Sequence, residues 1–282
     1  MDPIHSICVC GAGTMGSGIA QVAAQSGFYT ILYDLDATIL TKAKQSIGNN
    51  LQSLVDKGKL SSEKKTATLA HIKFSSDINQ CVANLLIEAI IEKAEAKVAL
   101  FNQLAELNHR ESIFATNTSS LSVKAIAEKV LNPERIIGLH FFNPAPLMKL
   151  VEVVKTPYIS QALIESIVTF AKQLGKTPVL CEDAPGFIVN HVARPYYLEA
   201  LKLVELGYAD FKIIDELLES SGFKLGPFRL MDLIGNDVNY AVSCSVYEAM
   251  NKPERLKPSS IQKEKVEKGE LGRKTNKGYY TY

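Results

Sequence analysis

The sequence predicts an α/β domain with a doubly wound, largely parallel sheet and an antiparallel addition at its edge, followed by an all-α C-terminal domain. Short apolar runs alternate with helical patterns in the first part of the chain, and an apolar hairpin follows them. From residue 187 onward the apolar period is helical throughout. The pattern breaks at Asp183, Ala184, Pro185 and Gly186, so we expect domains at 1–183 and 184–282.

The composition argues against several classes of protein. Lys and Arg number 31 against 30 for Asp and Glu, so no global charge attracts nucleic acid or an acidic membrane surface. No apolar run reaches the roughly 18 residues of a membrane span, and we expect no secretory signal. The cysteines are odd in number and show no metal-ligand spacing, which predicts no metal site and a reduced, cytoplasmic protein. They are Cys8, Cys10, Cys81, Cys181 and Cys244.

A glycine-rich turn follows the first predicted strand, at 4–10. Gly11, Gly13 and Gly16 have the spacing G-x-G-x-x-G, and a helical pattern continues from them to Gly27. Gly11 permits the tight turn, Gly13 lets the backbone approach a pyrophosphate, and Gly16 lets the helix pack closely on the strand. The phosphates would lie at the N-terminus of that helix.

A second strand, at 29–33, ends in Asp34 and completes the dinucleotide-binding fingerprint of a Rossmann-type domain. Asp34 would accept hydrogen bonds from the adenosine ribose hydroxyls. It would also repel a 2′-phosphate, and no Arg follows closely, so the pattern favours NAD over NADP. A glycine-rich turn without ligand is the alternative reading. The cofactor-binding residues expected in this segment are Gly11, Gly13, Thr14, Met15, Gly16 and Asp34.

Polar residues follow the next predicted strands, where open parallel sheets place ligand contacts. The strand at 85–91 ends in Glu92, with Lys97 one helical turn further. The strand at 112–116 precedes Asn117 and Ser119, and Ser122 suffices to cap the helix expected at 123–130. Capping explains some of these polar groups, but it leaves Asn117 and Ser119 without a structural role.

The hairpin at 136–154 carries one ionisable residue in each buried strand. His140 and Glu152 are equidistant from the turn around Pro146, so they should be cross-strand neighbours in an antiparallel pair. A buried carboxylate needs a partner, and a His held by a carboxylate is a common general base. A structural pair that staples the hairpin is equally compatible with this stretch alone.

The remaining pattern is mainly helical. A helix at 160–174 and a strand at 177–180 end the first domain, and helices are expected at 187–206, 211–221, 230–250 and 259–268. Asn190 lies in an apolar turn, where it either bonds to neighbouring backbone or reaches into the domain cleft. The helices at 187–206 and 230–250 carry more apolar residues than a small domain can bury, which predicts a homodimer. Two helices are expected within 36–70, where Lys42, Lys44 and Lys57 fit a solvated face better than a phosphate-binding edge.

The chain resembles the L-3-hydroxyacyl-CoA dehydrogenases, in particular the bacterial 3-hydroxybutyryl-CoA type. The resemblance runs end to end, through GAGTMGSGIA, LIEAIIEK, ATNTSSLS, GLHFFNPAPLMKLVEVV, DAPGFIVNHVARPYYLEA, GPFRLMDLIGNDVN and LGRKTNKGYY. It implies reversible, NAD-dependent oxidation of a 3-hydroxyacyl-CoA, with an acyl-CoA substrate and a dimer formed through the helical domain. It implies catalytic roles for His140, Glu152, Ser119 and Asn190, and cofactor contacts at Glu92, Lys97, Ser119, Asn143 and Lys274. Ser119, Asn190 and Lys57 are the implied substrate contacts, Lys57 for a CoA phosphate.

Two other classes remain open. A β-hydroxyacid dehydrogenase acting on small free acids would use a catalytic Lys in the interdomain helix, where this chain has Asn190 and His191. A non-catalytic NAD-binding sensor would be expected to lack the His or the Glu of the hairpin, and both are present.

Overall fold

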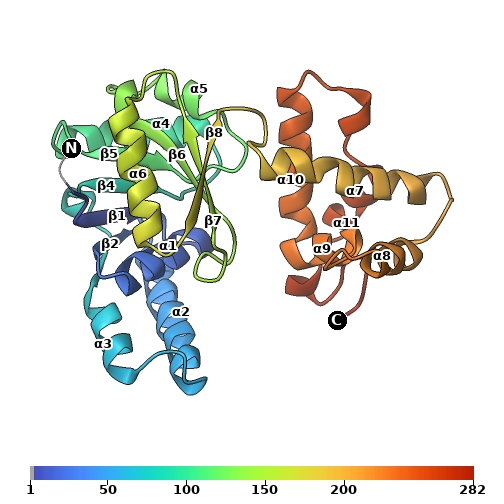
Figure 1. Cartoon of the computed structure of the whole chain (residues 1–282), viewed down its shortest axis with the longest axis horizontal. Helices are drawn as coiled ribbons and strands as arrows, with labels where there is room; N and C mark the ends of the chain where they lie inside the picture. The colour runs from blue at the N-terminus through green and yellow to red at the C-terminus, as the bar shows by residue number, and fades with distance from the viewer. Residues whose placement is uncertain (1–2) are drawn as a thin grey trace. The chain divides into compact units, whose positions relative to one another are not determined.

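A computed structural model describes residues 3–282, which form two compact units (Figure 1). The first unit ends at Asp183, and the second runs from Ala184 to Tyr282. No helix among the described residues is both long enough and apolar enough to cross a membrane.

The first unit is built on one eight-stranded sheet with the order β3-β2-β1-β4-β5-β6-β7-β8. Strands β1 to β6 run parallel, β7 pairs antiparallel with β6, and β8 pairs parallel with β7. This arrangement confirms the predicted doubly wound sheet with an antiparallel addition at its edge. The strands are β1 Ser6–Cys10, β2 Tyr29–Tyr33, β3 Ile72–Ser75, β4 Leu85–Glu88, β5 Ile113–Thr116, β6 Ile136–Phe141, β7 Leu150–Lys155 and β8 Thr177–Glu182.

Helices cover both faces of this sheet, so strands β4, β5 and β6 are buried along their whole length. The apolar side chains of α1, α2 and α6 share one core with Ile7 and Val9 of β1. Figure 1 shows α6 crossing in front of the sheet. Phe101 of α4 packs edge to face on Phe114 of β5, with ring centroids 5.9 Å apart. The helices are α1 Thr14–Gln25, α2 Ala37–Asp56, α3 Ser62–Ala70, α4 Ala94–Leu107, α5 Val123–Ala127 and α6 Gln161–Gln173, with short 3-10 turns η1 Ile78–Gln80 and η2 Pro133–Arg135.

The second unit is helical, as predicted. Its core is formed by Leu201, Phe228, Met231 and Val246, closed on one side by Tyr279 from the C-terminal segment. Its elements are α7 Val189–Glu205, α8 Phe211–Ser220, α9 Pro227–Ile234, α10 Asn236–Ala249, η3 Glu254–Leu256, α11 Ser260–Glu267 and η4 Arg273–Thr275.

Several predicted bounds were wrong. The single helix expected at 230–250 is two helices, because Gly235 between them has φ of 105°, outside the helical region. The helix expected from residue 187 begins at Val189, since Phe187 has φ of 50°. The strand expected at 85–91 ends at Glu88, and the helix expected at 123–130 ends at Ala127. Strand β3 was not predicted at all.

Candidate active site

The β6–β7 hairpin brings His140 and Glu152 together. The two residues are direct partners in the antiparallel register, as their distance from the turn predicted. The Nδ1 atom of His140 lies 2.7 Å from Oε2 of Glu152, and both side chains are buried, at 5% and 0% exposure. A buried carboxylate keeps the proton of a neutral imidazole on Nδ1, so the lone pair of the ring is on Nε2. Nε2 is therefore the atom with which this His can take a proton.

The carboxyl edge of the parallel sheet supports this pair. Gly138 is the register partner of Thr116, the last residue of β5, so His140 lies two residues beyond that strand end. Asn117 follows at once, and its side-chain oxygen accepts the backbone N–H of Phe141, at 2.8 Å. Asn117 thus has the structural role that the sequence did not reveal, because it ties the end of β5 to the residue after His140.

The loop between β6 and β7 carries Asn143 and is held by a lysine from outside the hairpin. The ammonium of Lys176, which precedes β8, donates to the carbonyls of Ala145 and Met148, at 2.5 and 2.8 Å. Lys176 is only 8% exposed, and burial lowers its pKa. The two hydrogen bonds of Lys176 therefore fix the path of the loop between Ala145 and Met148.

The glycine-rich turn has the geometry of a phosphate cradle. A Cβ atom on Gly11, at φ of 100°, would come within 2.5 Å of the Ala89 carbonyl oxygen, and one on Gly16 would overlap the carbonyl of Gly11. The protein's own packing therefore requires both of these glycines. A Cβ on Gly13 would meet no protein atom within 4 Å, so the open space lies at the N-terminus of α1, which Gly13 caps without a side chain. Phosphate oxygens fit such a position, beside the first amides of Thr14 and Met15.

Asp34 closes the other side of this turn. One carboxylate oxygen accepts the backbone N–H of Ala12, at 2.8 Å, and the other accepts that of Asp36, at 3.0 Å. Its side chain is only half-buried, at the end of β2. The carboxylate is thus fixed by the turn and partly open to solvent, as a ribose-binding acid requires.

An ion-pair network joins the ends of β4 and β5, with Lys97 and Glu88 buried and Glu92 exposed. The ammonium of Lys97 lies 2.6 Å from Glu88 and 3.1 Å from Glu92. Glu92 also accepts hydrogen bonds from the hydroxyl of Thr118, at 2.6 Å, and from the N–H of Ser119, at 3.1 Å. Three of the residues expected to contact the cofactor, Glu92, Lys97 and Ser119, therefore lie in one network.

The two carboxylates of this network differ in environment. Burial raises the pKa of Glu88, against the opposing charge of Lys97. Burial acts to raise the pKa of Glu92 as well, but the charge of Lys97 and the hydrogen bond from Thr118 outweigh it and lower that pKa. Glu92 therefore stays ionised beside the polar loop that carries Ser119.

A cavity of about 320 Å³ connects the glycine turn with the hairpin loop. Gly13 and Thr14 line it on one side and Asn143 on another, while Lys42 and Asn50 line it from α2. Lys57, at the C-cap of α2, is exposed to solvent and is not part of its lining. The cavity is thus lined by residues that we expect to contact the cofactor, from both the glycine turn and the hairpin loop.

The second unit carries Asn190 and Lys274. Asn190 lies in the first turn of α7, and its carbonyl accepts a hydrogen bond from Nε of Arg194, at 3.0 Å. Arg194 is 2% exposed and also donates to Ser243, at 2.8 Å, and burial lowers its pKa to about 10. The ammonium of Lys274, in η4, lies 2.6 Å from Asp237 of α10.

Comparison with known proteins decides the family. A family model described as the NAD-binding domain of 3-hydroxyacyl-CoA dehydrogenase matches residues 6–184, and the corresponding C-terminal domain matches residues 186–282. The chain belongs to the 3-hydroxyacyl-CoA dehydrogenase family. Its first unit therefore has the family's NAD-binding fold, and the family consists of oxidoreductases, as the resemblance implied.

Individual 3-hydroxyacyl-CoA dehydrogenases align along the whole chain. The 3-hydroxyadipyl-CoA dehydrogenase of Escherichia coli K12 is 47% identical over an alignment of 284 positions, which covers 100% of this chain and 60% of that protein. The mitochondrial hydroxyacyl-coenzyme A dehydrogenase of Sus scrofa is 40% identical over 99% of this chain and 91% of that protein. A crystal structure of 3-hydroxybutyryl-CoA dehydrogenase from E. coli K12 has a TM-score of 0.95 at 46% identity, covering 99% of this chain and 60% of that one. The chain thus spans about three-fifths of the length of the E. coli proteins.

Within this dehydrogenase fold, sequence reasoning missed the residues that hold the site together. Glu88 and Lys176 contact site residues or their loop in the first unit, and Arg194 does so in the second. Only Glu88 left a signal, as an acid at the end of an otherwise apolar strand. In the sequence Lys176 and Arg194 cannot be told from ordinary surface charges. Their partners here are backbone carbonyls, which every residue has, so no residue type indicates the contact.

Proposed function

We propose that this protein catalyses the reversible, NAD-dependent oxidation of a short-chain (S)-3-hydroxyacyl-CoA, such as 3-hydroxybutyryl-CoA, to the 3-ketoacyl-CoA. The observation that carries the proposal is the buried contact of 2.7 Å between His140 and Glu152. A purely structural pair does not require a place at the carboxyl edge of the sheet. His140 lies at that edge, two residues beyond the register partner of Thr116, and the glycine turn, Asp34 and the Lys97 network lie along the same edge.

The proton step belongs to His140. As the alcohol is oxidised, Nε2 takes the proton of the 3-hydroxyl group while C3 gives up a hydride. Glu152 holds the ring in the required tautomer and stabilises the imidazolium that results. In the direction of reduction the imidazolium returns the proton to the 3-keto oxygen. Ser119 and Asn190 are the groups we assign to hold the reacting oxygen in line.

The residues present fit NAD. The open space at Gly13, the N-terminus of α1 without a side-chain cap and the half-buried Asp34 suit a pyrophosphate and an adenosine ribose. When bound, NAD supplies the hydride acceptor. We assign the nicotinamide side to Glu92, Lys97, Ser119 and Asn143, with Lys274 from the helical domain.

The substrate assignment rests on relatives and on one charged residue. The E. coli proteins similar to this chain are named for 3-hydroxyadipyl-CoA and 3-hydroxybutyryl-CoA, which have short acyl chains. Lys57 places an exposed ammonium at the end of α2, where it can pair with a CoA phosphate.

We further propose a homodimer formed through the helical domain, in the cytoplasm. Large apolar side chains of this domain are exposed on several helices, including Leu203 at 40%, Ile213 at 56%, Leu217 at 65% and Leu233 at 50%. We expect a second subunit to cover these side chains, because large contiguous apolar patches on a protein surface mark interaction sites. Sedimentation at micromolar concentration should give twice the mass of the chain, and a monomer would contradict this assignment.

The function is tested by NADH oxidation with acetoacetyl-CoA, compared with free acetoacetate. We expect turnover of the thioester only, because the free acid lacks the CoA group. Activity with the free acid alone would favour a β-hydroxyacid dehydrogenase, and activity with neither would favour a non-catalytic NAD-binding protein. A series of 3-ketoacyl-CoA substrates of increasing length then tests the preference for short chains.

The base is tested by substitution. His140→Ala should lower kcat by about 10²- to 10⁴-fold, the usual contribution of a general base. Glu152→Gln should retain the fold and lower kcat. The exposed His5 supplies a matched control, since His5→Ala should leave turnover unchanged. Wild-type turnover in His140→Ala, or unfolding of Glu152→Gln, would instead support a purely structural pair.

A further inference from the structure

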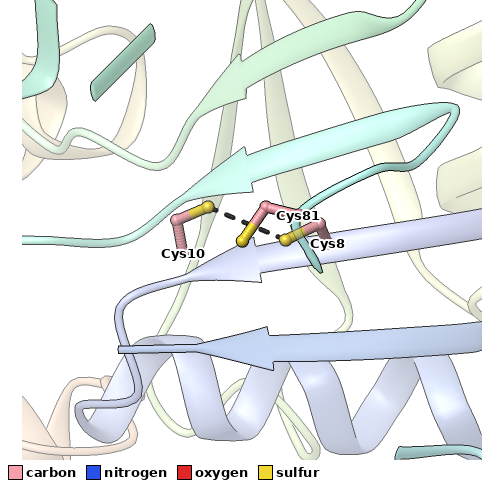
Figure 2. A group of neighbouring side chains, drawn as sticks. All are labelled: Cys8, Cys10 and Cys81. Atoms are coloured by element: carbon pink, nitrogen blue, oxygen red, sulfur yellow. Dashed lines mark hydrogen bonds between the residues drawn. The ribbon is translucent and has the colours of Figure 1, made fainter. Parts of the chain in front are cut away.

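Three cysteines that are scattered in the sequence form one cluster beneath the glycine turn (Figure 2). Cys8 and Cys10 lie on β1, and Cys81 comes from the loop that follows η1. Their sulfur atoms all lie within 4.8 Å of one another, and all three side chains are fully buried. Figure 2 shows the three side chains converging between β1 and the segment leading to β4.

The geometry of the cluster is that of a ligand set. Alternate residues of a strand point to the same face, so β1 presents Cys8 and Cys10 side by side, with their sulfur atoms 3.8 Å apart. Metal–thiolate bonds of about 2.3 Å place neighbouring sulfurs roughly 3.8–4.0 Å apart in tetrahedral or trigonal sites. A disulfide would require a bond of about 2.05 Å, and all three cysteines are free.

We propose that Cys8, Cys10 and Cys81 form a binding site for one soft monovalent cation of the copper(I) class. All three donors are sulfur, which selects soft metals over magnesium, calcium or manganese. No further His, Cys, Asp or Glu among residues 3–282 belongs to the group, whereas a structural zinc site takes four protein ligands. Because thiolates rather than thiols bind metals, the thiols of the cluster would release their protons to solvent as the ion binds.

The Cys81 ligand lies close to the surface. Residues 81–84 lie outside helix and strand, and Val82, next to Cys81, is 46% exposed. The side chain of Asn108 donates to the carbonyl of Cys81 and accepts the N–H of Ala83, at 2.8 and 3.0 Å, so this loop is held in place. All three ligands are therefore fixed by the fold before an ion binds.

The test is an anaerobic titration of the reduced full-length protein with copper(I), in competition with a chromophoric copper(I) chelator. We expect one equivalent to be withdrawn from the chelator, together with sulfur-to-copper charge-transfer absorption in the near ultraviolet. Cys81→Ser should weaken binding by more than about a hundredfold, since even the loss of an outer-shell partner weakens metal sites 10- to 100-fold. Cys181→Ser, which alters a buried cysteine outside the cluster, is the matched control and should bind like the wild type.

Three results would overturn the proposal. Stoichiometric copper(I) binding that survives in Cys81→Ser would place the ion elsewhere. Zinc binding of equal strength in a parallel competition would contradict the preference for a monovalent ion. A protein that loses 2 Da on mild oxidation through a Cys8–Cys81 or Cys10–Cys81 disulfide, and takes up no copper(I) when reduced, would show a redox pair instead. Cys8→Ser supplies a second variant if Cys81→Ser fails to fold, with circular dichroism as the check.

Discussion

The ammonium group of Lys97 lies 2.6 Å from a carboxylate oxygen of Glu88, and neither side chain is more than 1% exposed. The same carboxylate accepts a hydrogen bond from the hydroxyl of Thr116, at 2.7 Å, and another from the N–H of Ile90. Glu88 thus holds the ammonium of Lys97 where it also forms an ion pair with Glu92, in the loop that leads to α4. The ion pair holds in place the part of the network that we assign to the cofactor.

Removal of Glu88 should therefore destabilise the protein strongly. Glu88→Ala leaves the charge of Lys97 buried with only Glu92 nearby, and we expect a loss of about 3 kcal/mol in the free energy of unfolding. Urea denaturation measures this loss. The exposed Glu95 on the same helix as Lys97 is the control, and Glu95→Ala should change stability by less than about 0.5 kcal/mol. Equal effects from the two substitutions would show that the buried pair contributes no more than a surface charge.

Asn117 should matter through the strand that carries His140. Asn117→Ala removes the acceptor of the Phe141 N–H, which we expect to lower stability by about 1–3 kcal/mol and to reduce kcat. Asn117→Asp retains an acceptor at that position and should recover most of both losses. Urea denaturation and NADH oxidation with acetoacetyl-CoA measure the two effects. A variant Asn117→Ala with wild-type kcat would show that His140 is placed without this bond.

Lys176 should affect the cofactor rather than the proton transfer. Lys176→Met retains the buried aliphatic chain but leaves the carbonyls of Ala145 and Met148 without their donor, so the loop that carries Asn143 should loosen. We expect a higher Kd for NADH, measured by fluorescence titration, and a smaller change in kcat at saturating NADH. Lys172→Met on the exposed face of α6 is the control. Unchanged NADH affinity in Lys176→Met would show that the loop held by Lys176 does not contribute to cofactor binding.

The C-terminal segment that carries Lys274 should be sensitive to acid. Hydrogen bonds from Lys265 and Lys277 hold the pKa of Glu270 at about 2, below its ordinary value of 4.5. A carboxylate with a lowered pKa stabilises the fold above its unfolded-state pKa, and this stabilisation is lost as the pH falls through the folded-state value. Glu270→Gln should therefore melt at a lower temperature than the wild type at pH 7.

The same argument predicts how this difference depends on pH. The gap in Tm between Glu270→Gln and the wild type should begin to narrow below about pH 4.5 and continue to narrow toward pH 2. Scanning calorimetry at pH 7, 5, 4 and 3 measures it. Glu267→Gln, at an exposed position of α11, is the control and should show no such gap. A gap that stays constant over this range would contradict the assigned ion pairs.

Patterns local in the chain were enough to predict much of the fold. The spacing of Gly11, Gly13 and Gly16 at the start of a helix predicts a phosphate cradle, because Gly11 and Gly16 avoid clashes with the protein's own backbone and Gly13 leaves space for a ligand. The symmetric positions of His140 and Glu152 about their turn predict their register, since a hairpin allows only one partner for each residue. Strand β3 escaped prediction because four residues are too few to show a period.

The tertiary structure alone decided which distant residues meet. Cys81 is 71 positions after Cys10 and joins it only because the loop after η1 lies against β1. Lys176 holds a loop some thirty residues earlier through backbone carbonyls, for which one residue type is as good as another. The sequence by itself therefore determined the parallel sheet, the dinucleotide fingerprint and the His140–Glu152 pair, whose requirements are met within a few neighbouring residues. The buried ion pair, the loop clamp and the three-thiol cluster depend on how elements far apart in the chain pack together, and a one-dimensional pattern does not record such packing.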